Sequence, residues 1–170
     1  MSNTPNLLQG KRILIVDDEP DVLDVLEEIL RLCHVDRAAD FATAERLLNG
    51  EVYDAVILDI QGVDGFKLLR QSVAKDFPTV MLTAHAATPE SLKKSIELGA
   101  AGFLPKESMP ELEEILSAIL SGGGVRFWWM KSFERTNSFF EKRYGSDWRE
   151  KDAFFKAFQE SLRQEENQPK

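Results

Sequence analysis

Residues 12–17 read Arg-Ile-Leu-Ile-Val-Asp, and residues 53–59 read Tyr-Asp-Ala-Val-Ile-Leu-Asp. Each stretch is a short apolar run that ends on an acid, which is typical of a buried strand in a parallel sheet. Apolar residues at helical spacing follow the first run after Pro20, a residue suited to the first turn of a helix. The two runs therefore favour an α/β fold in which strands alternate with helices.

The same alternation continues to about residue 121. Further strands are expected at 35–39, 78–83 and 102–104, and further helices at 42–48, 65–74, 88–99 and 107–120. Five strand–helix repeats with short connections imply a parallel sheet covered by helices on both faces. Ligands bind to such sheets at the carboxyl ends of the strands. In this chain those ends carry five informative side chains: Asp17, Asp18, Asp59, Thr83 and Lys106.

Three of these side chains are carboxylates that would meet in one crevice. Like charges so close repel one another, and a hard divalent cation relieves the repulsion. Oxygen ligands without His or Cys favour Mg²⁺, and a metal beside a free carboxylate oxygen predicts phosphoryl transfer to aspartate. Lys106 would then pair with the phosphoryl group, and Thr83 would offer it a hydroxyl. A single Asp at a strand end is more often a helix cap or turn former, so the prediction rests on all five residues in order.

Over residues 10–121 the chain resembles the receiver domain of bacterial two-component response regulators. The matching stretches are ILIVDDEP (13–20), AVILDI (55–60), DGFKLLR (64–70), VMLTAH (80–85) and AAGFLPK (100–106). The resemblance implies a flavodoxin-like, doubly wound sheet with strand order 2-1-3-4-5. It also implies a signalling protein that a sensor histidine kinase or a phosphotransfer protein phosphorylates. Such a protein assists its own phosphorylation and dephosphorylation but turns over no outside substrate, so it is not an enzyme.

The family's site residues carry over onto matching positions of this chain. The resemblance makes Asp59 the phospho-acceptor and a ligand of Mg²⁺. Asp18 would bind the ion directly, Asp17 would bind it through water or as a weaker ligand, and the main-chain carbonyl of Gln61 would supply another oxygen. Thr83 and Lys106 would contact the phosphoryl group.

Three further positions are assigned by the same resemblance or by their spacing. Phe103 matches the aromatic switch position, whose ring turns inward when Thr83 shifts towards the phosphoryl group. The alternative interpretation is that Phe103 is a fixed ring of the core or surface. Gln61 and His85 each lie two positions past a site residue. They are expected to flank the path of an attacking water and to tune the lifetime of the phosphoryl group. The alternative for His85 is an ordinary solvated loop histidine.

Two departures from the family pattern lie beside the site. The Gly of the Asp-Gly pair, Gly65, comes six positions after Asp59, where receivers typically have eight, so the loop is two residues shorter. Receivers usually have a cis proline after the lysine, whereas here Pro105 precedes Lys106 and Glu107 follows it. A non-proline cis bond costs about 3–4 kcal/mol, so a trans or rearranged loop is expected. Neither departure removes a phosphorylation residue.

Charge and aromatic content divide the chain near residue 121. Residues 1–121 hold 11 Lys/Arg and 21 Asp/Glu, whereas residues 122–170 hold 10 and 8. Eleven of the 16 aromatic residues, including all three Trp, come after residue 121. The run Gly122–Gly124 marks a linker, so residues 125–165 are assigned to an aromatic-rich helical extension. Its second helix is expected to start near Ser146 or Asp147, which are good caps, and to run through about Arg163.

The extension is too short to bury its rings alone. They are expected to pack on the receiver itself, to form a homodimer or bind another protein, or to stay partly disordered. The acidity of residues 1–121 and the lack of a convincing helix-turn-helix argue against nucleic acid, so output through contacts with an unknown protein target is favoured. No segment approaches the ~18–20 apolar residues of a membrane span. No secretory signal is recognised, and the single Cys33 forms no internal disulfide, which together fit the cytoplasm.

Two other functions compete with the phosphorylated switch. If the altered loops abolish phosphorylation, the chain is a constitutive, receiver-like interaction scaffold. A magnesium-dependent phospho-aspartyl phosphatase would need a second acid two residues after its nucleophile, and this chain has Gln61 there. The phosphatase is discounted for that reason.

Overall fold

A computed structural model describes residues 6–84, 87–122, 129 and 136–166 of the chain. Five strands pair in parallel in the order β2-β1-β3-β4-β5. They are β1 (Arg12–Val16), β2 (His34–Ala38), β3 (Ala55–Leu58), β4 (Thr79–Thr83) and β5 (Gly102–Pro105). The strand order confirms the doubly wound α/β prediction.

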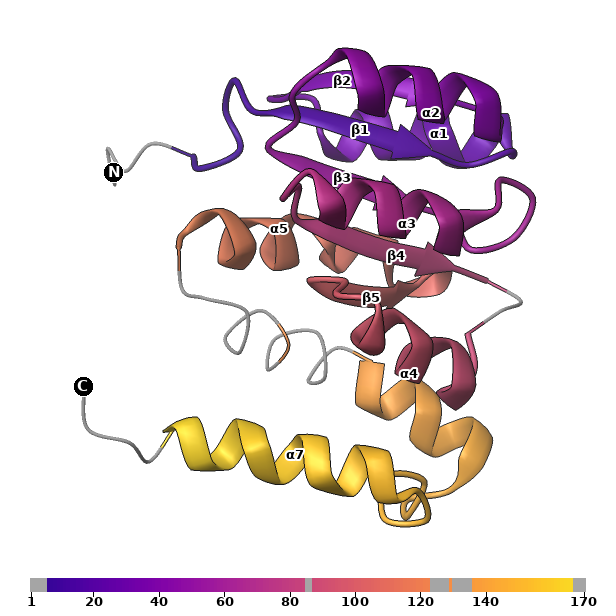
Figure 1. Ribbon diagram of the computed structural model, residues 1–170, viewed down its shortest axis with the longest axis vertical. Helices are drawn as coiled ribbons and strands as arrows, with labels where there is room; N and C mark the ends of the chain where they lie inside the picture. The colour runs from indigo at the N-terminus through magenta and orange to yellow at the C-terminus, as the bar shows by residue number, and fades with distance from the viewer. Residues whose placement is uncertain (1–5, 85–86, 123–128, 130–135, 167–170) are drawn as a thin grey trace.

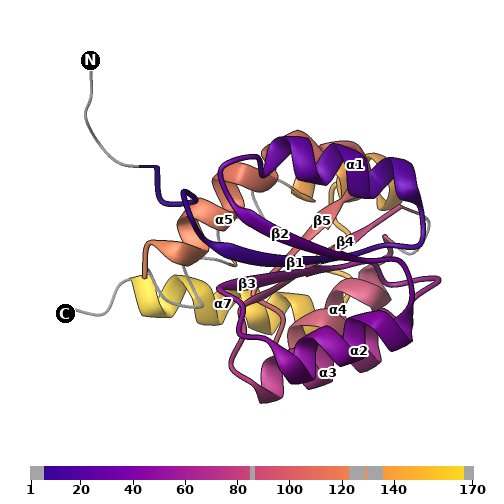
Figure 2. The same ribbon diagram turned by 90° about the horizontal axis from the view of Figure 1, so that it is seen from above.

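Helices cover both faces of the sheet (Figures 1 and 2). One face carries α1 (Pro20–Ile29) and α5 (Leu112–Leu120), and the other carries α2 (Phe41–Gly50), α3 (Gly65–Ala74) and α4 (Pro89–Glu97). Each layer has its own apolar cluster, because side chains of a strand alternate between the two faces. Ile13 and Ile15 of β1 belong to the cluster under α1 and α5, while Leu14 and Val16 belong to the other.

Local signals in the sequence explain where several helices begin. Pro20 occupies the first turn of α1, and the Asp40 side chain accepts a hydrogen bond from the Thr43 backbone N–H at 2.8 Å to cap α2. Between β5 and α5 the structure has a 3₁₀ segment, η1 (Lys106–Glu111), where a continuous helix was expected from residue 107. Pro110 lies inside this segment and has no N–H to donate. The regular helix therefore starts only at Leu112.

Where the structure describes the extension beyond residue 135, it has a helical segment at residues 136–144 and α7 (Ala153–Glu166). The expectation that the second helix starts at Ser146 or Asp147 is wrong. Residues 146–151 form a turn, in which the ring of Trp148 lies 4.8 Å from that of Phe140 and only 4% of Trp148 is exposed. The Asp152 side chain accepts a hydrogen bond from the Phe154 backbone N–H at 2.8 Å, a capping contact that places the helix start at Ala153.

The extension lies beyond the edge strand β5 and beside α4 (Figure 1). Its buried rings, Trp129, Phe140, Trp148 and Phe155, belong to the same apolar cluster as Phe103 of β5. Of the alternatives left open by the sequence, packing on the receiver is the one that the structure shows.

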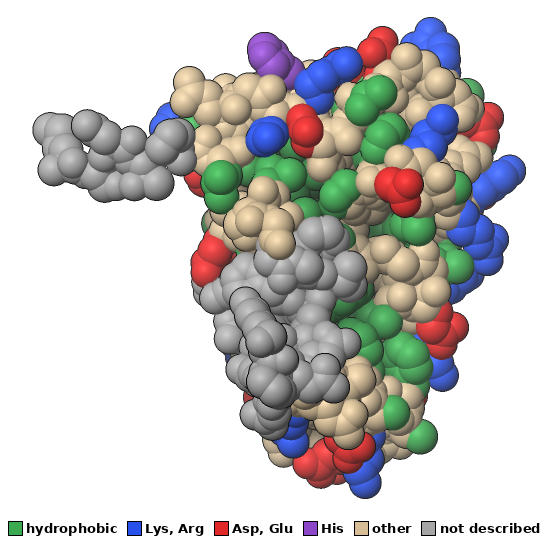
Figure 3. All heavy atoms as spheres, turned by 60° about the vertical axis from the view of Figure 1, so that its left-hand side comes forward, with side chains coloured by type: hydrophobic (Ala, Val, Ile, Leu, Met, Phe, Trp, Pro, Cys, Tyr) green, Lys and Arg blue, Asp and Glu red, His purple; other side chains and the backbone are tan. Residues whose placement is uncertain are grey.

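Surface charges of both signs are interspersed on the face drawn in Figure 3, with hydrophobic side chains between them. Among the described residues, the large hydrophobic side chains left exposed are Leu7, Val25, Leu32 and Val52. Within those same residues, no helix is long and apolar enough to span a membrane.

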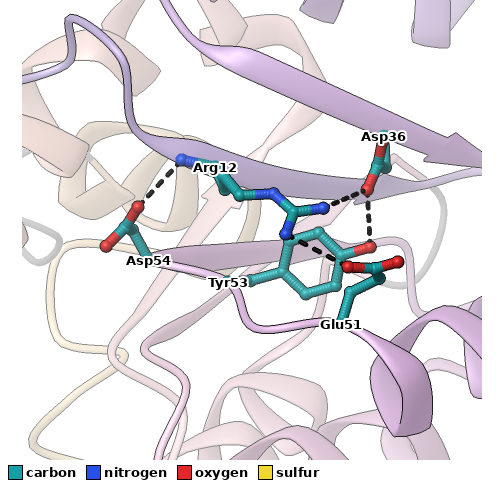
Figure 4. Close-up of polar contacts among 5 residues, drawn as sticks. All are labelled: Arg12, Asp36, Glu51, Tyr53 and Asp54. Carbon is teal, nitrogen blue, oxygen red and sulfur yellow. Dashed lines mark hydrogen bonds and ion pairs between the residues drawn. The ribbon is translucent and has the colours of Figure 1, made fainter.

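A polar network ties the amino-terminal end of the sheet together (Figure 4). The Arg12 guanidinium pairs with Asp36 at 3.3 Å and with Glu51 at 3.1 Å. The backbone N–H of Arg12 donates a hydrogen bond to the Asp54 carboxylate at 2.8 Å. The Tyr53 hydroxyl donates to Asp36 at 2.8 Å. The network joins β1, β2 and the segment before β3 at the edge opposite the predicted site, so its role is structural.

Candidate functional site

The carboxyl edge of the sheet brings together side chains from four strands. Asp17 directly follows β1, and Asp59 directly follows β3. Their backbones are fixed by the sheet, because the Asp59 N–H donates to Val16 O at 2.9 Å and the Asp17 N–H donates to Ala38 O at 3.1 Å. A pocket of about 310 Å³ opens above them, lined by Asp18, Glu19, Asp59, Gln61, Gly62, Thr83, Ala84 and Lys106. The predicted residues Asp18, Asp59, Gln61, Thr83 and Lys106 therefore share one pocket.

Lys106 is the cation at the centre of this site. Its Nζ atom lies 2.7 Å from Asp17 Oδ2, 3.1 Å from Glu19 Oε1 and 3.3 Å from Asp59 Oδ2. The side chains of Asp17 and Asp59 are only 1% and 6% exposed, so these ion pairs are poorly screened by water. The lysine thus partly neutralises the two buried carboxylates.

Burial and mutual repulsion shift the proton affinity of the two aspartates. Burial, followed by the charge of Asp17, raises the pKa of Asp59 to about 6, although Lys106 opposes the shift. Burial also raises the pKa of Asp17, against the lowering effect of its contacts with Lys106 and the Glu19 backbone. For Lys106, burial lowers the pKa, but contacts with Asp17, Asp59 and Glu19 outweigh it and the pKa rises above its ordinary value. Perturbed groups in one pocket are typical of a functional site.

The raised pKa makes Asp59 a source of instability at neutral pH. The folded chain holds this proton more tightly than the unfolded chain does, so the carboxyl favours folding below about pH 4 and loses that advantage as the pH rises through about 6. We expect Asp59→Asn to raise the free energy of unfolding at pH 7.5 by on the order of 1–3 kcal/mol. Urea titrations at pH 4 and 7.5 measure the effect, with exposed Asp76→Asn as the control. A gain equal at both pH values would contradict this origin.

The acidic groups of the pocket fit a hard cation. Oxygens of Asp17, Asp18 and Glu19 lie within 4.8 Å of one another. Asp17 Oδ2 is buried and has no hydrogen-bond partner among the described residues, so the Lys106 ion pair alone compensates it. An all-oxygen set of this kind suits Mg²⁺. Two of the side chains expected to hold the ion, Asp17 and Asp18, belong to this set, and the third, Asp59, lines the same pocket as Asp18.

Glu19 belongs to the site but was missed from the sequence. Its side chain lines the pocket and pairs with Lys106. The sequence pattern assigns only its neighbour, Pro20, to the first turn of a helix, and Glu19 is the N-cap residue of that helix, α1. A third acid directly after the Asp17-Asp18 pair was the signal that could have identified it.

The short loop after Asp59 is closed by two glycines in tight positions. Gly62 has φ +83°, and a Cβ there would lie 2.3 Å from Asp18 Oδ2. A Cβ on Gly65, the first residue of α3, would lie 1.9 Å from the Asp59 carbonyl oxygen. A side chain at either position would therefore collide with an atom of a site aspartate, the Asp18 carboxylate or the Asp59 carbonyl.

Gly65→Ala is expected to destabilise the chain and displace the Asp59 backbone. The added methyl would overlap a main-chain oxygen that cannot move without disturbing β3, and we expect a loss of about 1–3 kcal/mol or more in the free energy of unfolding. Gly50→Ala, at the end of α2, is the matched control, because nothing lies within 4 Å of its added Cβ. Equal urea midpoints for both variants would contradict the close approach.

Four further sequence predictions concern the Phe103 ring, the peptide bond after Lys106, Gln61 and His85. Phe103 is fully buried, with its ring centroid 6.2 Å from that of Phe140, and the turning of its ring stays a prediction. The peptide bond after Lys106 is trans, as expected when Glu107 follows. Gln61 lines the pocket, and its part in dephosphorylation stays a prediction. His85 lies outside the described residues.

Comparison with known proteins supplies the family context. A model of the response regulator receiver domain matches residues 13–119. The two-component response regulator ARR18 of Arabidopsis thaliana is 39% identical over 113 residues, which cover 62% of this chain and 18% of that protein. ORR24 of Oryza sativa subsp. indica, another two-component response regulator, is 40% identical over 104 residues, or 57% of this chain and 16% of that protein. The chain thus spans less than a fifth of these curated relatives.

Solved structures show the same fold. The non-phosphorylated HemR receiver domain from Leptospira biflexa is 35% identical, with a TM-score of 0.55 over 64% of this chain and 95% of that one. A CheY-like receiver domain protein from Methanospirillum hungatei JF-1 is 25% identical, with a TM-score of 0.58 over 68% of this chain and 100% of that one. Both likenesses stop short of the whole chain, which leaves about a third of it without a counterpart in them.

Proposed function

This chain belongs to the family of response regulator receiver domains, and we propose that it is a two-component response regulator whose Asp59 accepts a phosphoryl group. The observation that carries the proposal is the buried Asp59 carboxylate, which lines an open pocket 3.3 Å from the Lys106 ammonium. The raised pKa, about 6, leaves it mostly anionic at neutral pH. An anionic carboxylate facing a cation in a pocket is suited to nucleophilic attack on phosphorus.

The transfer itself needs little from the protein beyond positioning and charge. One Asp59 oxygen forms a bond to the phosphorus of the donor while the bond from phosphorus to the donor's leaving nitrogen or oxygen breaks, and the leaving group keeps the electron pair. Lys106 can turn from Asp59 to the new phosphoryl oxygens, and the Thr83 hydroxyl, at the end of β4, can donate to one of them. Mg²⁺, when bound by Asp17, Asp18, Asp59 and the Gln61 carbonyl, supplies further neutralisation of the phosphoryl charge.

The proposed partners follow from this chemistry. A sensor histidine kinase or a phosphotransfer protein provides the phosphoryl group in the cytoplasm, and the output passes through protein contacts rather than DNA. The acidity of residues 1–121 disfavours the phosphate backbone of DNA and so supports a protein target. Catalysis is confined to the chain's own phosphorylation and dephosphorylation.

Intact mass spectrometry tests the acceptor directly. Wild-type protein and Asp59→Asn are incubated with Mg²⁺ and acetyl phosphate, and one phosphoryl adduct is expected on the wild type alone. A receiver of known activity serves as the positive control. If that control is labelled and the wild type is not, the chain is instead a phosphorylation-independent scaffold. An adduct on Asp59→Asn would mean that another residue is the acceptor.

A further inference from the structure

A second pocket, of about 460 Å³, lies between the receiver and the extension. Its lining residues are Glu107, Ser108, Ser138, Phe139, Lys142 and Arg143. The first two belong to η1, and the other four belong to the helical segment at residues 136–144. These residues differ from those that line the pocket around Asp59. The hollow is called the basic pocket below, after its lysine and arginine.

The wall formed by the extension is set by helical spacing. Ser138 and Lys142 are four positions apart, as are Phe139 and Arg143, and side chains four apart lie on the same face of a helix. The Arg143 guanidinium lies 5.0 Å from the centroid of the Phe139 ring, a contact that helps to hold the charge in place. This wall therefore presents a hydroxyl, two cations and a half-buried ring.

The polar groups of the basic pocket are not used by the fold. Neither Lys142 nor Arg143 forms an ion pair with any residue that the structure describes. The hydroxyls of Ser108 and Ser138 likewise form no hydrogen bond within the described part of the chain. Lys106 is different, because three carboxylates surround it. An anion could thus bind in the basic pocket without breaking an ion pair of the folded chain.

Charge and size indicate the class of ligand. Two cations outweigh the one acid that lines the pocket, Glu107, although the whole chain has a net charge of −8. Lys and Arg side chains with hydroxyl donors beside them are suited to phosphate oxygens. A volume of about 460 Å³ is typical of a small-molecule site and is more than a bare phosphate ion fills. The ring of Phe139 offers an apolar surface for the rest of a larger ligand.

We propose that the basic pocket binds the phosphate group of a small organic phosphate monoester. The phosphate oxygens contact Lys142, Arg143 and the two serine hydroxyls, and the organic part lies against Phe139. Because the walls come from η1 and from the extension, the ligand contacts both. Binding involves no phosphoryl transfer, so the inference holds whether or not Asp59 is a phospho-acceptor.

Amide chemical shifts measure this binding residue by residue. The isotope-labelled whole chain is titrated with phenyl phosphate, and separately with inorganic phosphate, at constant ionic strength and without Mg²⁺. We expect saturable shifts at Ser108 and at residues 138–143. Phenyl phosphate should bind at least about fourfold more tightly than inorganic phosphate, the effect of burying apolar surface equal to one methylene group.

Variants that change the charge of the pocket should shift the affinity in opposite directions. Lys142→Gln is expected to weaken the binding of phenyl phosphate about tenfold, the effect of losing one hydrogen bond between charged groups. Glu107→Gln should tighten it about two- to fivefold, because a nearby exposed negative charge is removed. Lys156→Gln, at an exposed position of α7 outside the pocket, is the matched control and should bind as wild type does. All three side chains are exposed, so each variant should keep the wild-type amide spectrum away from its own position.

The same titrations can overturn the proposal. Shifts that do not saturate, or that are confined to Asp59, Thr83 and Lys106, would show that the basic pocket does not take the anion. Equal affinity of Lys142→Gln and wild type would remove its cations from the binding. Inorganic phosphate that binds as tightly as phenyl phosphate would overturn the assignment to an ester and leave the free ion as the ligand.

Discussion

Lys106→Met is expected to slow the labelling of Asp59 by acetyl phosphate about 100-fold, the usual effect of removing one donor that stabilises a developing negative charge. The methionine keeps the length of the side chain but removes the cation that lies within 3.3 Å of both Asp17 and Asp59. The two buried carboxylates would then repel each other without compensation. Because Lys106 lowers the pKa of Asp59, its loss should also raise that pKa and reduce the anionic fraction at neutral pH.

Two measurements distinguish this effect from simple misfolding. Lys75→Met, an exposed lysine directly after α3, is the matched control and should label at the wild-type rate. Labelling of Lys106→Met should also recover partly as the pH is raised, because part of the defect is protonation of Asp59. A variant that labels as fast as wild type would show that the lysine serves only to hold the folded site together.

Phe140→Ala is expected to lower the stability of the docked extension by about 3–5 kcal/mol, the range found for a fully buried phenylalanine. Its ring contacts Phe103, Phe139, Tyr144 and Trp148, and no neighbour can fill the space that it leaves without breaking another ring contact. The receiver has a second apolar cluster under α1 and α5 that does not include these rings. The extension should therefore detach before the receiver unfolds.

Urea titration with two probes resolves the order of events. Trp emission reports on the extension and far-ultraviolet circular dichroism reports mainly on the receiver, so the two midpoints should separate in Phe140→Ala and coincide more closely in wild type. Phe139 is a half-buried neighbour on the same helical segment, and Phe139→Ala should lower the stability of the docked extension by less than half as much as Phe140→Ala. Coincident transitions in Phe140→Ala would show that the extension and the receiver form one cooperative unit.

Strong local patterns made most of the receiver predictable. The runs that end on Asp17 and Asp59 have apolar residues on both faces of the strand, which is typical of central strands in a parallel sheet. Because parallel strands end at the same edge of the sheet, the residues at their carboxyl ends are expected to lie together. Pro20 and the Thr88–Ser91 capping box are likewise local and mark the beginnings of α1 and α4. Each of these features depends on a few neighbouring residues.

Features that depend on distant contacts were not predictable in the same way. Residues 146–151 form a turn rather than the start of α7, and in it Trp148 packs on Phe140, a contact that no local pattern encodes. The helix then begins at Ala153, after the capping contact of Asp152. Glu19 follows the Asp17-Asp18 pair directly, but its ion pair with Lys106, 87 residues later, is a contact that the local sequence does not encode. The same reason applies to the surface that covers the extension. An apolar stripe on a helix shows that some surface must cover it, but not whether that surface belongs to the receiver or to another chain.

The position of β5 at the end of the sheet has a consequence for solubility. Both ends of a sheet present unpaired backbone groups to which another chain can add. The other edge strand, β2, carries Asp36 and Arg37, charges that discourage such addition. Strand β5 reads Gly-Phe-Leu-Pro, is buried along its length, and has no charge of its own. A fragment cut at Ser121 would expose this apolar edge, so the receiver alone should self-associate at lower concentrations than the whole chain does.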